Sequence, residues 1–360
     1  MNHKIVIVVD DSTRQIWAES LLRAVLNYHG TEATIYSLQG IGELQKFISA
    51  DMNVIELPTV RSLLKSILLS KKKGDSITLV STSHKSASLV YLVGKFVRIR
   101  HVNAGMNQPN YFPEMTRVGR TLGHIHELIR HFYSRNSSIL IAFSGEVTEN
   151  FLKKRISEDK IVKVSIGVDT SKVPLVQKKL FPSDWRYLDI CAVGRLSWEK
   201  NYPALISILS CFRDRGWTGK CFIIGEGPLR AEIEHLVSSV GLNDQIEICG
   251  WVENIKSFYD RCNVLIHTSR TESYGQAIIE ARFSSLATIS TPVGVSIDLA
   301  ASLDSFHHQI PHEFQQSDIE KTIDFLTSIE GVWVKLDKAI VKSHIAEKNI
   351  VLLAKTIAEI

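Results

Sequence analysis

The sequence predicts an α/β protein of two domains, each built on a parallel sheet covered by helices. The chain has 360 residues, which is long for a single hydrophobic core. Short apolar runs alternate with segments of helical periodicity, the pattern of parallel sheets with crossover helices. A looser stretch that contains proline interrupts this alternation at 170–185, and the pattern then starts again. We therefore expect domains at 1–168 and 169–340, with a final helix at 341–360.

The first half of the chain contains seven apolar runs of strand length. Between them, apolar residues recur three and four positions apart, as at Leu63, Leu64 and Ile67, which is the spacing of a helix with one buried side. The predicted strands are Ile5–Val9, Thr34–Ser37, Val54–Leu57, Ile77–Ser81, Val97–Val102, Ile139–Phe143 and Ile161–Ile166.

The second half repeats the pattern with five further apolar runs. At the end of the chain, the spacing predicts one helix whose apolar side carries Ile345, Leu352, Leu353 and Ile357. The predicted strands are Leu188–Val193, Cys221–Ile224, Ile246–Cys249, Val264–His267 and Ala287–Ser290.

The composition is that of an ordinary globular protein, with 44% hydrophobic and 22% charged residues. No apolar run reaches the roughly 20 residues of a membrane-spanning helix. The first strand meets Asp10 and Asp11 too early for a signal peptide, which favours a cytoplasmic location. The five cysteines form no Cys-x-x-Cys pair or Cys/His cluster, and we expect buried free thiols.

The net charge of +4 is distributed unevenly along the chain. Residues 1–170 hold 22 Lys and Arg against 15 Asp and Glu, whereas residues 171–360 hold 20 against 23. A basic first half suggests an anionic partner, such as a membrane, an acidic glycolipid or nucleic acid. An ordinary solvated surface remains the alternative interpretation.

Two glutamates separated by seven residues are the most informative feature. Glu272 follows an apolar strand, and Glu280 lies about one turn into the next predicted helix. Ser273, Tyr274 and Gly275 lead into that helix, whose free amides attract phosphate. Two carboxylates beside a phosphate site are suited to accept hydrogen bonds from neutral hydroxyls on either side of the phosphate. The pattern therefore predicts a nucleotide-sugar, in which a diphosphate joins a ribose to a hexose.

Two cations and two turns are expected at neighbouring strand ends, where open α/β sheets bind ligands. Arg195 and Lys200 follow one strand and are suited to phosphate oxygens. Gly225 and Gly227 follow the next strand and let the backbone approach a ligand, with Pro228 at a helix start.

A fourth segment, Cys249-Gly250-Trp251-Val252, follows a further strand. Its backbone groups and the ring of Trp251 are candidates for contact with a flat base, with Val252 beside them. Trp251 packing within the protein is the alternative.

These segments, in this order, resemble the retaining glycosyltransferases of the GT-B fold, family 4 (glycosyl transferases group 1). The family carries G-R-x4-K, G-x-G-P, F/C-G-x-V and E-x7-E motifs, and this chain matches all four between Gly194 and Glu280. Thr291-Pro292-Val293-Gly294 matches a further family turn, and Val164–Asp169 resembles the segment between the domains. The resemblance implies two Rossmann-like domains facing a central cleft, with the final helix crossing back onto the first domain.

The resemblance also implies roles in the first domain, which would bind the acceptor. Arg98-Ile99-Arg100-His101 is similar to the segment with the family's active-site histidine. His84 follows another strand and is a candidate for the acceptor side, and so is Ser12 in the loop after the first strand. That loop lacks the family's glycines, and Asn201 stands where the family has a glycine after the donor lysine.

The implied reaction is transfer of a sugar from a nucleotide-diphosphate sugar to a glycan or glycolipid, with retention and without a metal or other cofactor. Arg195 and Lys200 would neutralise the leaving diphosphate, Glu280 would accept from the ribose, and Glu272 would hold the transferred sugar. The sequence contains no Asp-x-Asp motif. The acceptor would be a glycan or lipid-linked glycan, with peripheral association to an anionic membrane face and no nucleic-acid partner.

Several alternatives stay open. An epimerase acting on nucleotide-sugars shares the two-domain fold, and a protein that only binds carbohydrate could have kept it. Glu272 and Glu280 also suit a solvated helix start, and Arg195 and Lys200 also suit a surface pair. His101 could be a structural histidine with both ring nitrogens satisfied.

Overall fold

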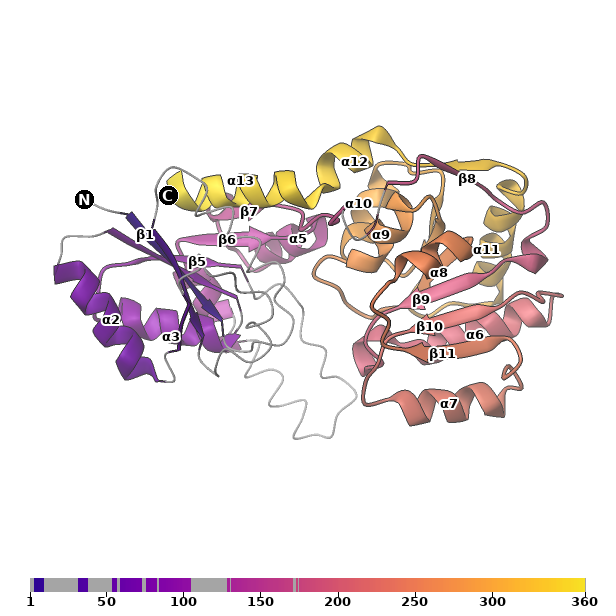
Figure 1. Ribbon diagram of the computed structural model, residues 1–360, viewed down its shortest axis with the longest axis horizontal. Helices are drawn as coiled ribbons and strands as arrows, with labels where there is room; N and C mark the ends of the chain where they lie inside the picture. The colour runs from indigo at the N-terminus through magenta and orange to yellow at the C-terminus, as the bar shows by residue number, and fades with distance from the viewer. Residues whose placement is uncertain are drawn as a thin grey trace. The chain divides into compact units, whose positions relative to one another are not determined.

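A computed structural model describes residues 3–9, 32–37, 54–56, 59–72, 76–82, 84–104, 128–129, 131–170, 173 and 175–359. The chain divides by its contacts into two compact units (Figure 1). Unit 1 comprises Met1–Phe143, Val147–Ile166 and Glu347–Ile360. Unit 2 comprises Ser144–Glu146 and Gly167–Ala346. Each contains a parallel sheet with helices packed on it, so the predicted α/β fold class is confirmed.

Unit 1 contains a parallel sheet whose described strands run in the order β3-β2-β1-β4-β5-β6-β7. Val6 and Val8 of β1 pack with Leu63 and Ile67 of α2 in one buried cluster. Strands covered on both faces read as continuous apolar runs, which explains why β1 was visible in the sequence. The strands are β1 His3–Val9, β2 Glu32–Ser37, β3 Val54–Glu56, β4 Ser76–Ser81, β5 Arg100–Asn103, β6 Ile139–Ala142 and β7 Ile161–Lys163. The helices are α2 Val60–Lys72, α3 His84–Gly94 and α5 Gly145–Lys153.

Unit 2 contains a parallel sheet in the order β11-β10-β9-β12-β13-β14 and an antiparallel pair, β15-β8. Its core includes Trp217, whose indole Nε1 donates to the carbonyl of Leu188 at 2.9 Å. The strands are β8 Lys178–Leu180, β9 Ile190–Val193, β10 Cys221–Ile224, β11 Ile246–Gly250, β12 Val264–His267, β13 Ala287–Ser290, β14 His307–Gln309 and β15 Trp333–Lys335. The helices are α6 Tyr202–Arg213, α7 Arg230–Ser239, α8 Lys256–Arg261, α9 Gln276–Phe283, α10 Val295–Ala301, α11 Gln316–Ser328 and α12 Lys338–His344.

Most strand predictions hold, but some limits were wrong. The strand predicted at Val97–Val102 begins only at Arg100, because the amides of Phe96 and Val97 both donate to the carbonyl of Val93 and close the end of α3. Pro228 does not begin a helix, since α7 begins at Arg230. β14 was not predicted, because it reads His-His-Gln and has no apolar run.

The final helix was predicted as one element, and the structure shows two. Ile345 lies between α12 and α13 (Ala346–Glu359) in an extended conformation and pairs with Val168 in an isolated bridge. Leu353 and Ile357 are buried on α13, whereas Leu352 is half exposed. The residues Glu347–Ile360 belong to unit 1, so the return of the final helix to the first domain is confirmed.

The cysteines are free thiols, as expected, but two of them are not fully buried. Cys211 and Cys249 are half-buried, and Cys249 lies on β11, the first strand in the order of the sheet. Among the helices of the described ranges, none is long and apolar enough to cross a membrane.

Candidate functional site

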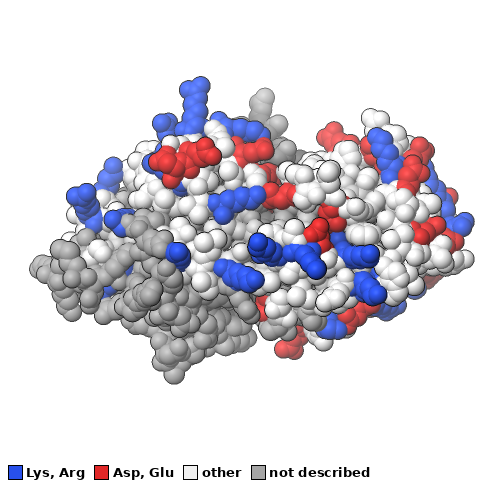
Figure 2. Space-filling model, turned by 90° about the horizontal axis from the view of Figure 1, so that it is seen from above, with Lys and Arg blue, Asp and Glu red and all other residues white. Residues whose placement is uncertain are grey.

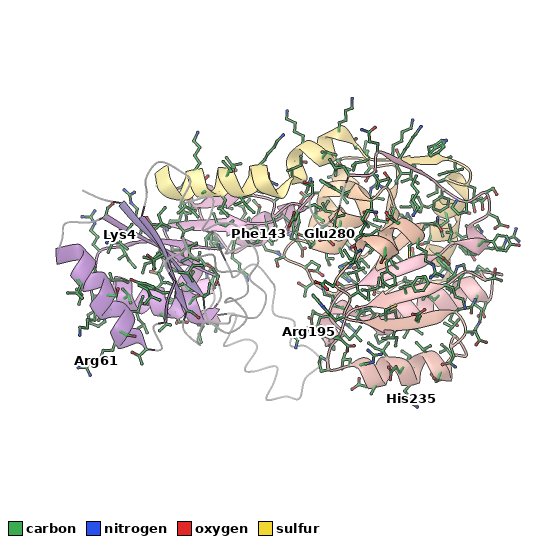
Figure 3. The ribbon with its side chains drawn as sticks, viewed as in Figure 1. Lys4, Arg61, Phe143, Arg195, His235 and Glu280 are labelled. Atoms are coloured by element: carbon green, nitrogen blue, oxygen red, sulfur yellow. The ribbon has the colours of Figure 1, made fainter. Side chains whose placement is uncertain are left out.

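The candidate site of unit 2 lies where the order of strands reverses. The chain passes from β9 to β10 on one side and later returns to β12 on the other side of β9. Because these strands are parallel, the residues that follow β9 and β12 share one edge of the sheet. In open α/β sheets this edge, at the reversal, is where ligands bind. Figure 3 labels Arg195, which follows β9, and Glu280, which lies on α9.

Glu272 is held at this edge by three donors that converge on one of its oxygens. His267 Nε2 lies 3.0 Å from Oε1 and Ser269 Oγ donates to the same oxygen at 3.1 Å. The ammonium of Lys200 forms an ion pair with it as well. Glu272 is 7% exposed, and His267 and Ser269 are buried. The sequence had brought Glu272 and Lys200 to one site, and the structure places them in direct contact.

The surroundings keep Glu272 ionised. Burial alone would raise the pKa of the Glu272 carboxyl, but the charge of Lys200 and hydrogen bonds from His267 and Lys200 outweigh it and hold that pKa below its ordinary value. The pKa of His267 is lowered by burial in the first place, so the ring is neutral near pH 7. The cluster therefore combines one cation, one carboxylate and one neutral imidazole.

Lys200 reaches Glu272 because the chain turns sharply after it. Lys200 ends a short 3-10 helix, Trp198–Lys200, and α6 begins at Tyr202. Between them Asn201 adopts the left-handed conformation, with φ 51° and ψ 47°. Glycine adopts this conformation at little cost, and asparagine is among the few other residues that do. Asn201 therefore provides a left-handed residue at the position where the family's motif has a glycine.

Arg195 is exposed, in contrast to Lys200. No residue that the structure describes accepts a hydrogen bond from its guanidinium. The two cations predicted for phosphate are therefore in different states, because Lys200 already has a carboxylate partner and Arg195 faces solvent.

Gly225 and Gly227 hold the Arg195 loop in place. A Cβ at Gly225 would lie 2.0 Å from the carbonyl oxygen of Gly194, and one at Gly227 would lie 2.3 Å from that of Leu196. The backbones of the two loops are also joined by hydrogen bonds, including Leu196 N–H to the Glu226 carbonyl at 3.0 Å. Only glycine allows this approach, so these residues support the loop that carries Arg195.

The start of α9 lies between the two glutamates, as predicted. Gly275 precedes the helix with φ 90°, and a Cβ there would meet Ile278 at 3.2 Å. Tyr274 is buried, and its hydroxyl accepts from the amide of Gly167 at 3.2 Å. Ser273 is half-buried beside Glu272 in the sequence. The hydrogen bond to Tyr274 fixes the loop to Gly167, where the main segment of unit 2 begins.

Glu280 is oriented by neutral donors. The Tyr259 hydroxyl donates to Oε2 at 3.0 Å, and the Gln276 amide donates to Oε1 at 3.1 Å. Tyr259 is fully buried, and burial followed by the charge of Glu280 raises the pKa of its phenol well above the ordinary value. Gln276 also donates to the carbonyl of Gly167 at 2.9 Å. Glu280 is half-buried, so it keeps access to solvent.

Trp251 and Val252 follow β11. Trp251 is 74% exposed, which does not fit the alternative that its ring packs within the protein. Val252 is half-buried. That the two residues contact the base of a nucleotide stays a prediction.

His101 lies within β5 and not after a strand. Its Nε2 is 2.8 Å from Ser81 Oγ, and its Nδ1 is 3.3 Å from Ser137 Oγ. Burial lowers the pKa of His101 to about 4, so the ring is neutral. Both nitrogens have partners, which favours the structural interpretation that the sequence left open.

The remaining first-domain predictions cannot be placed as sites. His84 begins α3, directly after β4, and its side chain lies outside the described residues. Ser12 also lies outside the described residues. Their acceptor-side roles stay predictions.

Four residues at the two glutamates were not anticipated: His267, Ser269, Tyr259 and Gln276. Ser269 is three residues before Glu272 and Gln276 is four before Glu280, a local signal that was available. His267 ends the strand that was recognised, and a polar residue at such a strand end is a usable sign. Tyr259 lies 21 residues from Glu280, and only the fold brings them together.

In a comparison with known proteins, a family model matches most of unit 2. Residues 177–342 match the family model described as glycosyl transferases group 1. The range contains all the residues predicted here for the nucleotide-sugar. The predicted resemblance to glycosyl transferases group 1 is therefore confirmed for residues 177–342.

The relatives match over different lengths. The amylovoran biosynthesis glycosyltransferase AmsD of Erwinia amylovora is 32% identical over 101 residues, which is 28% of this chain and 28% of AmsD. The capsular polysaccharide biosynthesis glycosyltransferase CapM of Staphylococcus aureus is 22% identical over 266 residues, 71% of this chain and 69% of CapM. The crystal structure of Anabaena Alr3699/HepE in complex with UDP aligns with a TM-score of 0.76 and 15% identity, over 99% of this chain and 100% of that one. At this identity the likeness shows the fold, which is the predicted GT-B class.

Proposed function

We propose that this protein transfers a sugar from a nucleotide-diphosphate sugar to a glycan or lipid-linked glycan. The observation that carries the proposal is the meeting of Lys200 with Glu272 beside the exposed Arg195, at the reversal of the sheet. Cations there suit a diphosphate, and carboxylates suit the hydroxyls on either side of it. The relatives support the proposal by their names, and Anabaena Alr3699/HepE has been crystallised with UDP and with UDP-glucose.

Each residue has a role that follows from its surroundings. Arg195 and Lys200 neutralise the charge that grows on the leaving diphosphate, which is transition-state stabilisation. The amides at Gly275 add to it. Glu280 accepts from the ribose hydroxyls, and Glu272 accepts from the transferred sugar and orients its C1 atom.

We propose retention by attack on the same face from which the diphosphate leaves. The acceptor oxygen bonds to C1 as the C1–O bond to phosphate breaks, and the leaving phosphate oxygen takes the acceptor proton. No protein nucleophile is needed. The fixed cations take the place of a metal, and neither step requires a redox cofactor.

A donor-consumption assay tests the proposal and separates it from its alternatives. The protein is mixed with UDP-glucose, UDP-galactose, UDP-N-acetylglucosamine or GDP-mannose, with and without a glycan or lipid-linked glycan extract. We expect release of the nucleoside diphosphate that is accelerated by the acceptor. Interconversion of the nucleotide-sugars without release would indicate an epimerase, and binding without turnover would indicate a binding protein.

We further propose that the acceptor side associates with an anionic membrane face. The basic first half supports this, and Lys153 and Arg155 are exposed at and just after the end of α5. Lys71, Lys72 and Lys73 have no described side chains. On the face in Figure 2, Lys and Arg are interspersed with Asp and Glu, so the charge does not form a single field there.

Vesicle binding tests this association. Basic residues near anionic lipid contribute about 1 kcal/mol each, and salt screens them. We expect binding to phosphatidylserine vesicles that falls as salt is raised, and weak binding to phosphatidylcholine vesicles. Equal binding to both vesicles, or to neither, would point to a water-soluble acceptor.

A further inference from the structure

The bonding around Glu272 is asymmetric in a way that its proposed role does not require. Lys200, His267 and Ser269 all donate to Oε1. No residue in the described part of the chain donates to Oε2. One oxygen is therefore fixed by the protein, and the other is left for a ligand.

The three donors differ in what a ligand does to them. A diphosphate that binds at this edge competes for the ammonium of Lys200, because phosphate oxygens attract it as strongly as a carboxylate does. Glu272 is 7% exposed, so losing its cation leaves a buried charge that needs other donors. His267 and Ser269 are neutral, so the charge of a phosphate does not draw them away from Glu272.

Of these two, His267 has the more rigid support. It is the last residue of β12, is paired with Ser290 of β13, and its carbonyl accepts from Thr291 N–H at 3.0 Å. An ionised carboxylate only accepts hydrogen bonds, so Nε2 must carry the proton that lies between the two groups. Ser269 offers a hydroxyl that can rotate to another acceptor.

We propose that His267 is a positioning residue for the glycosyl donor: its Nε2–H fixes Glu272 Oε1 while Lys200 turns to the phosphates, and Oε2 is thereby aimed at a hydroxyl of the transferred sugar. The proposal rests on the proposed function and adds a residue to it. His267 itself touches neither the sugar nor the phosphate.

The side-chain lengths provide the test. The amide nitrogen of glutamine lies as many bonds from Cβ as Nε2 of histidine, whereas that of asparagine matches Nδ1. H267Q should therefore keep the hydrogen bond, and H267N and H267L should lose it. His307 on β14 is a matched control, because it is half-buried and bonded to the hydroxyls of Thr288 and Ser296, away from Glu272.

The first measurement is titration calorimetry on the full chain. The probes are UDP and the UDP-sugar that the wild type binds most tightly among UDP-glucose, UDP-galactose and UDP-N-acetylglucosamine. We expect H267L and H267N to bind UDP with a Kd within about twofold of that of wild type. The additional affinity for the UDP-sugar over UDP should fall by about 10-fold to 100-fold, which is the range for a hydrogen bond to a charged group. We expect kcat to fall by a similar factor, H267Q to recover most of both, and H307Q to change neither.

A second measurement needs no variant and no ligand. The ¹⁵N chemical shifts of the His267 ring in the wild-type protein report its tautomer, and we expect the proton on Nε2. A proton on Nδ1, or H267L behaving like H307Q, would overturn the positioning role while leaving the transferase proposal in place. A wild type that carries the Nε2 proton but binds none of the UDP ligands and neither GDP nor GDP-mannose would instead contradict the proposed function itself.

Discussion

Glu272 and Glu280 are only eight positions apart, yet the protein holds them in different ways. Glu272 is buried and bonded to a cation, and its three donors share one oxygen. Glu280 is half-buried and receives neutral donors on both oxygens, from Tyr259 and Gln276. One carboxylate is thus coupled to a charge, and the other accepts hydrogen bonds from a tyrosine and a glutamine.

The difference separates a role in substrate binding from a role in the chemical step. A carboxylate that accepts from the ribose makes the same contact before and during reaction, so its loss falls on KM. A group coupled to Lys200 feels the charge that develops on the diphosphate, so the loss of Lys200 falls on kcat. On the proposed function, Glu280 belongs to binding and the Lys200–Glu272 pair belongs to the chemical step.

The largest effect is expected from removing a cation. K200A and R195A should each lower kcat by about 100-fold or more, because the leaving diphosphate loses a counter-charge in the transition state. Steady-state kinetics with saturating donor measures this. K256A is the control, since Lys256 forms an exposed pair with Asp260, and such pairs contribute little.

A chelator sharpens the same prediction. Wild-type activity should persist in EDTA, because fixed side chains carry the charge. Activity that is abolished by EDTA and restored by Mg²⁺ or Mn²⁺ would contradict the metal-free mechanism, and so would a K200A variant with unchanged kcat.

Glu272 should also affect the stability of the fold in acid. The folded-state pKa of Glu272 is held below its ordinary value of 4.5, so its ionised form stabilises the fold above that pH. This contribution is lost as pH falls below 4.5, because the unfolded chain then binds the proton first. Urea unfolding between pH 7 and 3 should show a shallower loss of stability for E272Q than for wild type. An equally steep loss in E272Q would contradict the account.

The smallest effect is expected from removing a hydroxyl that donates to Glu280. Y259F removes the hydroxyl that donates to Oε2 and should raise the donor KM by about fivefold, the value of one hydrogen bond of about 1 kcal/mol. We expect kcat to stay within twofold. Y187F, at an exposed tyrosine of the same unit, is the control. A fall in kcat with unchanged KM would place Glu280 in the chemical step.

The sequence predicted the parts of the site that are local and missed those that the fold assembles. The E-x7-E spacing located both glutamates, because a strand end and the following helix start fix their places. Asn201 is a departure from the family's motif, and its left-handed φ shows that it adopts a conformation that glycine adopts readily. His267 and Tyr259 were given no role, because only packing shows which acceptor a buried polar side chain meets. The break at Ile345 was missed for the same reason, since its partner is Val168.

The most direct test of the division between the two carboxylates is calorimetric titration of UDP and a UDP-sugar into wild type, E272Q and E280Q. E280Q should weaken both ligands alike, by about 10-fold, because both contain the ribose. E272Q should bind UDP as tightly as wild type or more tightly, since Lys200 is released, and should lose the additional affinity for the sugar. If E280Q left UDP binding unchanged, or E272Q weakened both ligands equally, the assignment of Glu280 to the ribose and Glu272 to the sugar would be wrong.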